Sequence, residues 1–361
     1  MFNKNLAYNE LPFLPPQGDL ETKKVLKKVG NVKAALAELK GWMLTQPNPM
    51  LLLETLTLQE AKASSEIENI VTTNDEIYQA FISPVMTKYS PAVKEVLHYK
   101  DALWSVYPKI ADGYPLTINV MVDLFRIVKE RMDGIRRLPG TRLVNKYRDT
   151  VYTPPDSYEK IMQCLENLEN YINTDDDVEP LIKMAVMHYQ FECIHPFPDG
   201  NGRVGRLLNV LYLVKNKFID FPILYLSRYI MEHKKDYYLS LQKVTETGNW
   251  EDWILYMLDA VEMTAKDTLD MVKKIYFAWD ECAKRVKRDL PGIYSAELIG
   301  VIFERPYCKI NFLVERGLAK PQTASKYLRA LKDCGVLGCV SAGREKYYIN
   351  DVLLNIIKNV D

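Results

Sequence analysis

The stretch His195-Pro-Phe-Pro-Asp-Gly-Asn-Gly-Arg-Val-Gly-Arg206 holds an imidazole, a carboxylate, a Gly-Asn-Gly turn and two guanidiniums within twelve residues. Apolar sequence of helical character lies on both sides of it. Because Gly200 and Gly202 have no Cβ, the chain can turn sharply there and bring its N–H groups close to an anion. We expect these glycines at the N-terminus of a helix over 204–215, where unpaired N–H groups and the helix dipole favour phosphate.

The side chains of this stretch point to the same chemistry. Arg203 and Arg206 are three positions apart, so both can lie on one face of the first helical turn and donate paired hydrogen bonds to phosphate. A carboxylate at Asp199 can hold Mg²⁺ against phosphate oxygens, and an imidazole at His195 can accept a proton near neutral pH. Each feature alone is compatible with an ordinary turn or a solvated helix face. Together they predict a polyphosphate site beside a general base.

These residues resemble the signature of the Fic family, His-x-Phe-x-(Asp/Glu)-Gly-Asn-Gly-Arg-x-x-Arg, at every fixed position. Members of that family transfer AMP from ATP to a hydroxyl on a protein. The resemblance implies that His195 is the catalytic base, that Asp199 holds Mg²⁺ on ATP and that Phe197 anchors the loop in the core. It implies that the remaining signature residues bind the nucleotide phosphates: Gly200, Asn201, Gly202, Arg203 and, for the γ-phosphate, Arg206.

A second segment, Ser64-Ser-Glu-Ile-Glu68-Asn69, resembles the family's inhibitory motif, (Ser/Thr)-x-x-x-Glu-(Gly/Asn), in the form that precedes the catalytic motif. The resemblance implies that Ser64, Glu68 and Asn69 form an inhibitory segment, in which Glu68 pairs with Arg206 in place of the γ-phosphate. A carboxylate can present two oxygens to a guanidinium as a phosphate does. Without the downstream signature, a serine and a glutamate four positions apart also fit a solvated helix face. Tyr238, in a Tyr-Tyr pair, resembles a tyrosine that borders the adenine pocket.

Composition narrows the class of protein. Of 361 residues, 48% are hydrophobic, and 47 Lys+Arg balance 47 Asp+Glu, so no global charge points to nucleic acid or to an anionic membrane. The six cysteines form no Cys-x-x-Cys pair and fit reduced structural thiols. The first eighteen residues lack the apolar segment of a signal peptide, and no apolar run reaches membrane-spanning length. We expect a soluble cytoplasmic protein without membrane contact.

Helical periodicity dominates the chain and predicts an all-α fold, which the resemblance identifies as a Fic-type helical bundle. We expect an N-terminal helical region with the inhibitory motif at 1–95, a catalytic domain at 96–290 and a third domain at 291–361. Within the catalytic domain, the pattern of 139–155 predicts a β-hairpin that ends in prolines. In the family such a hairpin is a flap, and its exposed edge at 141–153 can hold an extended segment of a protein substrate by main-chain hydrogen bonds.

The last domain shows three short helical patterns and then two strand-like runs, which resembles a winged helix-turn-helix. Its candidate contacts with a DNA major groove lie within 305–349: Gln322, Thr323, Lys326 and Arg329. Residues 291–361 hold ten Lys+Arg against seven Asp+Glu, a weak electrostatic footprint, so DNA is not the favoured partner. Such domains also serve dimerisation or target docking, which leaves a homodimer as an alternative.

The sequence favours a protein AMP transferase that uses Mg·ATP and is autoinhibited by Glu68. Three alternatives stay open at this stage. The same site can remove AMP from a modified protein if Glu68 activates a water. The transferred group can differ, since some Fic-fold proteins transfer phosphate or phosphocholine, although intact Arg203 and Arg206 favour AMP. Finally, the chain can be a DNA-binding regulator whose helical part senses nucleotide.

Overall fold

The computed structural model of the chain describes residues 2–46, 53–82, 89–145, 147–342 and 345–358. The described residues are mostly helical, with two small antiparallel sheets, as expected. Among these residues we find no helix that is both long enough and apolar enough to span a membrane.

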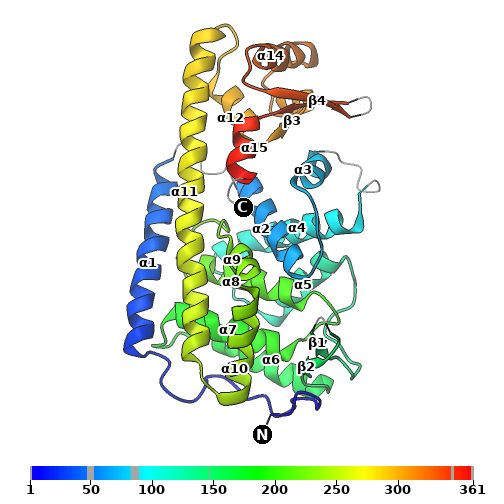
Figure 1. Cartoon of the computed structure of the whole chain (residues 1–361), viewed down its shortest axis with the longest axis vertical. Helices are drawn as coiled ribbons and strands as arrows, with labels where there is room; N and C mark the ends of the chain where they lie inside the picture. The colour runs from blue at the N-terminus through cyan, green and yellow to red at the C-terminus, as the bar shows by residue number, and fades with distance from the viewer. Residues whose placement is uncertain (1, 47–52, 83–88, 146, 343–344, 359–361) are drawn as a thin grey trace.

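Two long helices run side by side along the molecule (Figure 1): α1 (Lys23–Leu44) and α11 (Glu251–Asp289). The apolar face of α1 recurs at helical spacing and is buried against α11 through residues such as Val25, Val29 and Leu36. Thr22 caps α1 by accepting a hydrogen bond from the N–H of Val25. Lys28 of α1 forms ion pairs with Asp259 and Glu262 of α11, the latter at 2.5 Å.

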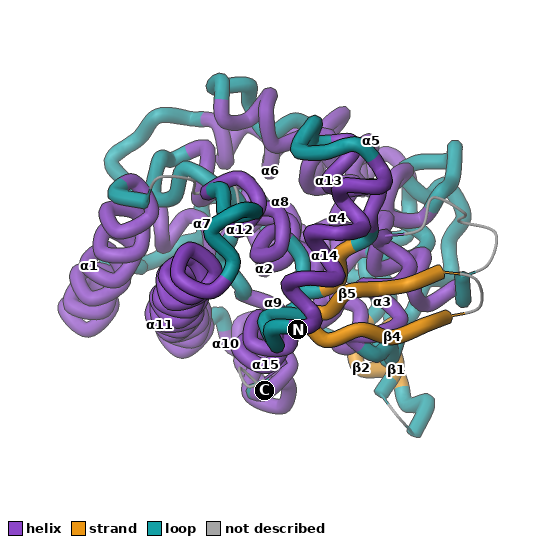
Figure 2. The backbone as a smooth tube through the Cα atoms, turned by 90° about the horizontal axis from the view of Figure 1, so that it is seen from above, coloured by secondary structure: helices purple, strands orange, loops and turns teal. Residues whose placement is uncertain are grey.

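The signature segment joins two buried helices in the middle of the bundle, α7 (Pro180–Ile194) and α8 (Asn201–Lys215). Both are buried on nearly every side because other helices surround them, and α8 buries Arg203 and Arg206 together with its apolar residues. The helices α2 (Leu53–Ile67), α4 (Pro91–Ala111), α5 (Ile118–Lys129), α6 (Tyr158–Asn173), α9 (Leu226–Glu232) and α11 pack against α7 or α8. Helix α3 (Asn74–Ile82) packs against α4, and α10 (Lys234–Thr247) packs against α11. Figure 2 shows this packing from above. Helix α8 begins at Asn201, three residues before the predicted start, so Gly200 is its N-cap and Gly202 lies inside its first turn.

The predicted hairpin forms, but its paired part is short. Strands β1 (Leu143–Val144) and β2 (Thr150–Tyr152) are antiparallel, with Leu143 opposite Tyr152. The Asn145 side chain closes the turn by accepting hydrogen bonds of 2.9 Å from the N–H groups of Tyr147 and Asp149. Just after β2, the segment that precedes α1 lies against the chain, because the N–H of Tyr8 donates to the Thr153 carbonyl at 3.0 Å. Among the described residues no further strand pairs with β1, so its outer edge is the open side of the hairpin.

The C-terminal part contains the three predicted helices and the hairpin: α12 (Ala296–Glu304), α13 (Ile310–Glu315), α14 (Pro321–Asp333), β4 (Gly338–Ala342) and β5 (Glu345–Ile349). It also contains two elements that the sequence pattern did not predict, β3 (Tyr307–Cys308) and α15 (Asp351–Lys358). The sheet order is β3-β5-β4. A helix, a short strand, two helices and a hairpin in this order have the element order of a winged helix.

Candidate functional site

The loop between α7 and α8 is held in one shape by its own residues. His195 ends α7 in the left-handed region (φ 48°, ψ 58°), and its N–H donates to the Phe191 carbonyl at 3.0 Å. Across the loop, the Asn201 side chain accepts from the Phe197 N–H at 2.9 Å and donates to the Phe197 carbonyl at 2.7 Å. Phe197 is fully buried, as expected, and stacks on Phe125 with ring centroids 4.4 Å apart.

This geometry refines the role expected for Asn201. Its side chain is 2% exposed and is fully engaged with the loop, so it shapes the turn and does not reach toward a ligand. Any contribution of Asn201 to anion binding comes from its main-chain N–H. The first-turn N–H groups of α8 have no carbonyl to bond within the helix, and the Gly200 N-cap (φ 76°) leaves them uncovered by a capping side chain.

His195 is partly buried beside the signature turn. Burial, followed by the nearby Arg136 guanidinium, lowers the pKa of His195 to about 4. Arg136 fixes the loop here, because its Nε donates to the His195 carbonyl at 2.8 Å and its main-chain N–H donates to the Pro196 carbonyl at 2.9 Å. The imidazole is therefore neutral at pH 7 and able to accept a proton, as a general base must be.

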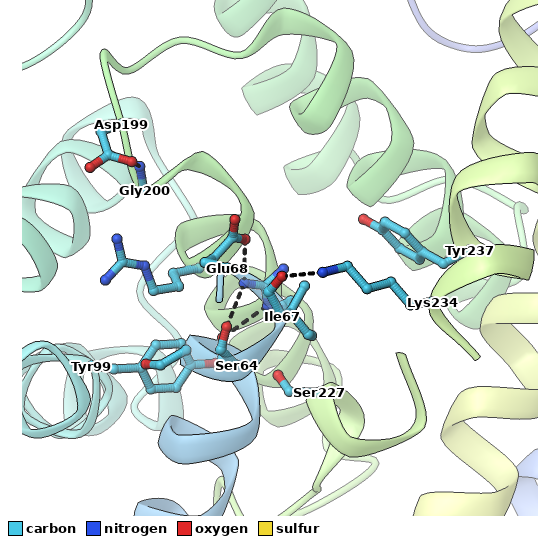
Figure 3. Close-up of polar contacts among 12 residues, drawn as sticks. Ser64, Ile67, Glu68, Tyr99, Asp199, Gly200, Ser227, Lys234 and Tyr237 are labelled. Atoms are coloured by element: carbon cyan, nitrogen blue, oxygen red, sulfur yellow. Dashed lines mark hydrogen bonds and ion pairs between the residues drawn. The ribbon is translucent and has the colours of Figure 1, made fainter. Parts of the chain in front are cut away.

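The guanidinium of Arg206 donates hydrogen bonds to Ser64 and Glu68 at the C-terminal end of α2 (Figure 3). Its Nη2 donates to Glu68 Oε1 at 2.8 Å, its Nε donates to Ser64 Oγ at 2.9 Å, and Nη2 also donates to the Ser64 carbonyl at 3.0 Å. The Arg206 side chain is 2% exposed, whereas Glu68 keeps 36% of its side chain exposed. Burial alone would raise the pKa of Glu68, but Arg206 outweighs it and lowers that pKa. The pair is therefore ionised on both sides near neutral pH.

Gly202 makes this contact possible. A Cβ at position 202 would lie 2.5 Å from Glu68 Oε1 and 2.9 Å from Arg206 Nη1, closer than such atoms approach. The glycine in the first turn of α8 thus leaves the space that the carboxylate occupies. The same space is where the resemblance places a phosphate group of ATP.

Arg203 and Asp199 belong to a second network of ion pairs, which does not include Glu68. Arg203 is buried and forms an ion pair with Glu95 of α4. Lys129 of α5 pairs with Glu95 at 3.3 Å and with Asp199 Oδ2 at 2.6 Å. Burial would raise the pKa of Asp199, but the hydrogen bond from Lys129 holds it below its usual value. Glu95 and Lys129 were not predicted, because they lie in helices with no motif and only the fold brings them to the signature turn.

The residues fit a magnesium ion bound together with ATP. Within the described part of the chain no cluster of three metal-ligating side chains occurs. Mg²⁺ keeps several waters and commonly takes one or two carboxylates plus substrate phosphates, so a single carboxylate beside a phosphate site is sufficient. Asp199 is 60% exposed at the N-terminus of α8, and its Oδ1 accepts the Gly200 N–H at 2.7 Å, which orients the carboxylate.

Two further carboxyls lie near Arg206, and the sequence did not point to either. Glu60 of α2 is buried and accepts hydrogen bonds from the Tyr99 hydroxyl at 3.0 Å, the Ser227 N–H at 3.0 Å and the Ser227 hydroxyl. Glu192 of α7 has a buried Oε1 without a hydrogen-bond partner among the described residues, and burial raises its pKa to about 7.

Tyr238 lies close to the Glu68–Arg206 pair. Burial and then the Glu68 carboxylate raise its pKa to about 12, while 50% of the residue stays exposed. Its neighbour Tyr237 is buried and bonds His188 Nε2 at 2.8 Å, which makes His188 a packed core residue. The candidate DNA contacts lie away from this site, on the exposed face of α14: Gln322, Thr323, Lys326 and Arg329.

Comparison with known proteins gives three family matches along the chain. The N-terminal domain of the Fic/DOC family matches residues 26–107, the Fic/DOC family domain matches 115–213, and the C-terminal domain of SoFic-like protein adenylyltransferases matches 279–353. A solved Fic family protein from Desulfovibrio desulfuricans has the same fold, with a TM-score of 0.60 at 16% identity over 93% of this chain and 98% of that one.

Two curated relatives are protein adenylyltransferases by name. A probable protein adenylyltransferase of Aquifex aeolicus is 26% identical over 181 residues, which are 49% of this chain and 54% of the relative. Protein adenylyltransferase fic-1 of Caenorhabditis elegans is 29% identical over 121 residues, 33% of this chain and 22% of the relative. The chain thus spans about half or less of the length of these relatives. With the signature turn, its fold and the matched domains in agreement, the chain belongs to the Fic/DOC family.

Proposed function

We propose that this chain transfers AMP from ATP to a Ser, Thr or Tyr hydroxyl of a protein, itself included, and that Glu68 inhibits the transfer by pairing with Arg206. One observation carries the proposal. Near the N-terminus of α8, which no side chain caps, the buried Arg206 donates a hydrogen bond to the carboxylate of Glu68, 138 positions upstream. The names of the curated relatives support the same reaction.

In the proposed reaction the target hydroxyl oxygen forms a bond to the α-phosphorus of ATP. The bond from that phosphorus to the bridging oxygen breaks, and pyrophosphate leaves. His195 takes the hydroxyl proton, for which its neutral imidazole is suited. The N–H groups at the start of α8, together with Arg203 and Arg206, stabilise the charge on the phosphates. Mg²⁺ held by Asp199 would supply further neutralisation of phosphate charge.

Inhibition follows from competition for one guanidinium. While Arg206 donates to Glu68 and Ser64, it cannot also bind a γ-phosphate with two hydrogen bonds. ATP that enters under these conditions lacks this contact, and its α-phosphate is not aligned for in-line attack. In this proposal Tyr238 borders the adenine, and its half-exposed position near Glu68 supports that role.

The hairpin is the proposed docking site for the protein substrate. The edge of β1 is open, and the apolar residues Val144 and Tyr147 at the hairpin are 53% and 73% exposed. An extended target segment can add to this edge through main-chain hydrogen bonds, which demands little of its sequence.

The test is labelled-ATP incorporation by two variants, Glu68→Gly and Glu68→Gly with His195→Ala. The first should label itself and the second should lose about 10²–10⁴ of that rate while still binding ATP, since the imidazole is needed only for the proton. Equal labelling by both would overturn the role of His195. A third result, release of AMP from a previously labelled protein by the wild-type chain, would show that Glu68 activates water and that the site runs in reverse.

A further inference from the structure

The helix that delivers Glu68 is also bound at its other end. Helix α2 begins at Leu53, and its first turn contacts the chain just after α12. Arg305 donates to Glu54 Oε2 from both Nη2, at 2.7 Å, and Nε, at 2.9 Å. Next to this pair, the Thr55 hydroxyl donates to the Glu304 carbonyl at 3.1 Å. The C-terminal domain is therefore bound to the first turn of α2 by an ion pair and a hydrogen bond.

The same domain binds the helix that follows Glu68. The Tyr307 hydroxyl of β3 donates to Asp75 Oδ1 of α3 at 2.7 Å, and its ring stacks on Tyr78 with centroids 6.0 Å apart. Lys358 of α15 reaches Asp75 at 3.5 Å. Figure 1 shows α2 and α3 lying directly below β3 and α15. Both helices that flank Glu68 are thus bound to one domain.

Helix α2 connects the contact at Glu54 to the contact at Glu68, so a displacement of its first turn also moves Glu68. Glu54 and Glu68 are fourteen positions apart, which corresponds to about 21 Å along a helix. Nearly every described residue of α2 is buried, so the helix can move only with its neighbours or as a unit. At its far end, Lys234 Nζ donates to the Ile67 carbonyl at 2.5 Å, next to the Glu68–Arg206 pair (Figure 3).

We propose that Arg305 is a positioning residue for inhibition: through Glu54 it holds α2 in the place where Glu68 reaches Arg206. This inference rests on the proposed function and adds that the C-terminal domain sets how often Glu68 occupies the phosphate site. Molecules in which Glu68 has left Arg206 are a small fraction of the total. A substitution that weakens the binding of α2 to the C-terminal domain by a given factor therefore raises that active fraction by the same factor.

The experiment uses charge reversal in the full chain, with labelled AMP incorporation as the readout. Arg305→Glu and Glu54→Arg should each raise incorporation, by about fivefold for a partly buried pair. The double variant Glu54→Arg with Arg305→Glu restores opposite charges and should return incorporation to near the wild-type level. In a Glu68→Gly background all three should match Glu68→Gly alone, because the carboxylate that they position is gone.

Lys28→Glu is the matched control. Lys28 and Arg305 have similar side-chain exposure, 19% and 21%, but the ion pairs of Lys28 join α1 to α11 and not to α2 or α3. The Lys28→Glu variant should lose the ion pairs between α1 and α11 without raising AMP incorporation. The inference is overturned if the reversals leave incorporation unchanged, if they raise it equally without Glu68, or if Lys28→Glu raises it as much. If Glu68→Gly itself incorporates no AMP, the proposed function fails, and the inference fails with it. If Glu68→Gly incorporates AMP but Arg305→Glu and Glu54→Arg leave incorporation at the wild-type level, only the inference is overturned.

Discussion

Arg206 Nη2 and Glu68 Oε1 lie 2.8 Å apart although 138 positions of sequence separate the two residues. The contact joins the first two turns of α8 to the end of α2, and Ser64 adds two hydrogen bonds to the same guanidinium. Because the arginine side chain is 2% exposed, it needs an anionic partner, either this carboxylate or a phosphate. The following predictions test the site built around this pair.

Asp199→Ala should remove the Mg²⁺ dependence of ATP binding in the Glu68→Gly background. The Asp199 carboxylate is exposed at the start of α8, where the proposed function places the phosphates, and the Gly200 N–H orients it. Calorimetry with and without Mg²⁺ measures the effect, and Asp199→Asn, which keeps the shape, should behave in the same way. An affinity for Mg·ATP equal to that of the parent would show that Asp199 is not the metal anchor.

Val144→Pro should reduce AMP incorporation into protein more than it reduces ATP affinity. Proline removes an N–H from β1, the strand with the open edge, and this weakens both the hairpin and any strand added to it. The measurement is the ratio of incorporation to ATP affinity in the Glu68→Gly background, with thermal melting as the check on folding. A parallel loss of both quantities would indicate misfolding and not a docking role.

The double variant Glu68→Gly with Glu192→Gln should transfer AMP at a rate that does not fall as the pH is lowered from 8 to 5.5. Burial and Arg136 lower the pKa of His195 to about 4, so the proton-accepting form persists throughout this range and is lost only below it. The pKa of Asp199 is also held low, and Glu192, whose pKa is raised to about 7, is removed by the substitution. A rate that declines with a midpoint near 6.5 would mean that His195 titrates as an ordinary exposed histidine.

Much of the site was predictable because its residues are adjacent in sequence. The signature turn, the burial of Phe197 and the helix-terminal position of Gly200 follow from local patterns, and the Glu68–Arg206 contact follows from the family resemblance. Glu95, Lys129, Glu60 and Glu192 could not be found in this way. Each is a single charged residue in an ordinary helical pattern, and only the packing of α2, α4, α5 and α7 brings it to the site.

The fold shows the same division. The helical class was predictable because buried residues recur at helical spacing along segments as long as α1. The two-residue strand β3 was missed, since so short a segment carries no periodicity and exists only by pairing with β5. Helix α8 begins at Asn201 and not at the expected position 204, because Gly202 is tolerated in the first helical turn, where it leaves room for Glu68.

The most direct test of the central claim is labelled AMP incorporation by the wild-type chain, Glu68→Gly, and Glu68→Gly with Arg206→Ala at equal concentration. If Glu68 inhibits by occupying Arg206, the single variant should exceed wild type by about 10-fold or more, since a charge-assisted pair of this kind is worth ~1.5–3 kcal/mol. The double variant should lose that gain, because the freed arginine is what the single variant uses. A Glu68→Gly protein that is folded by circular dichroism and no more active than wild type would contradict the account.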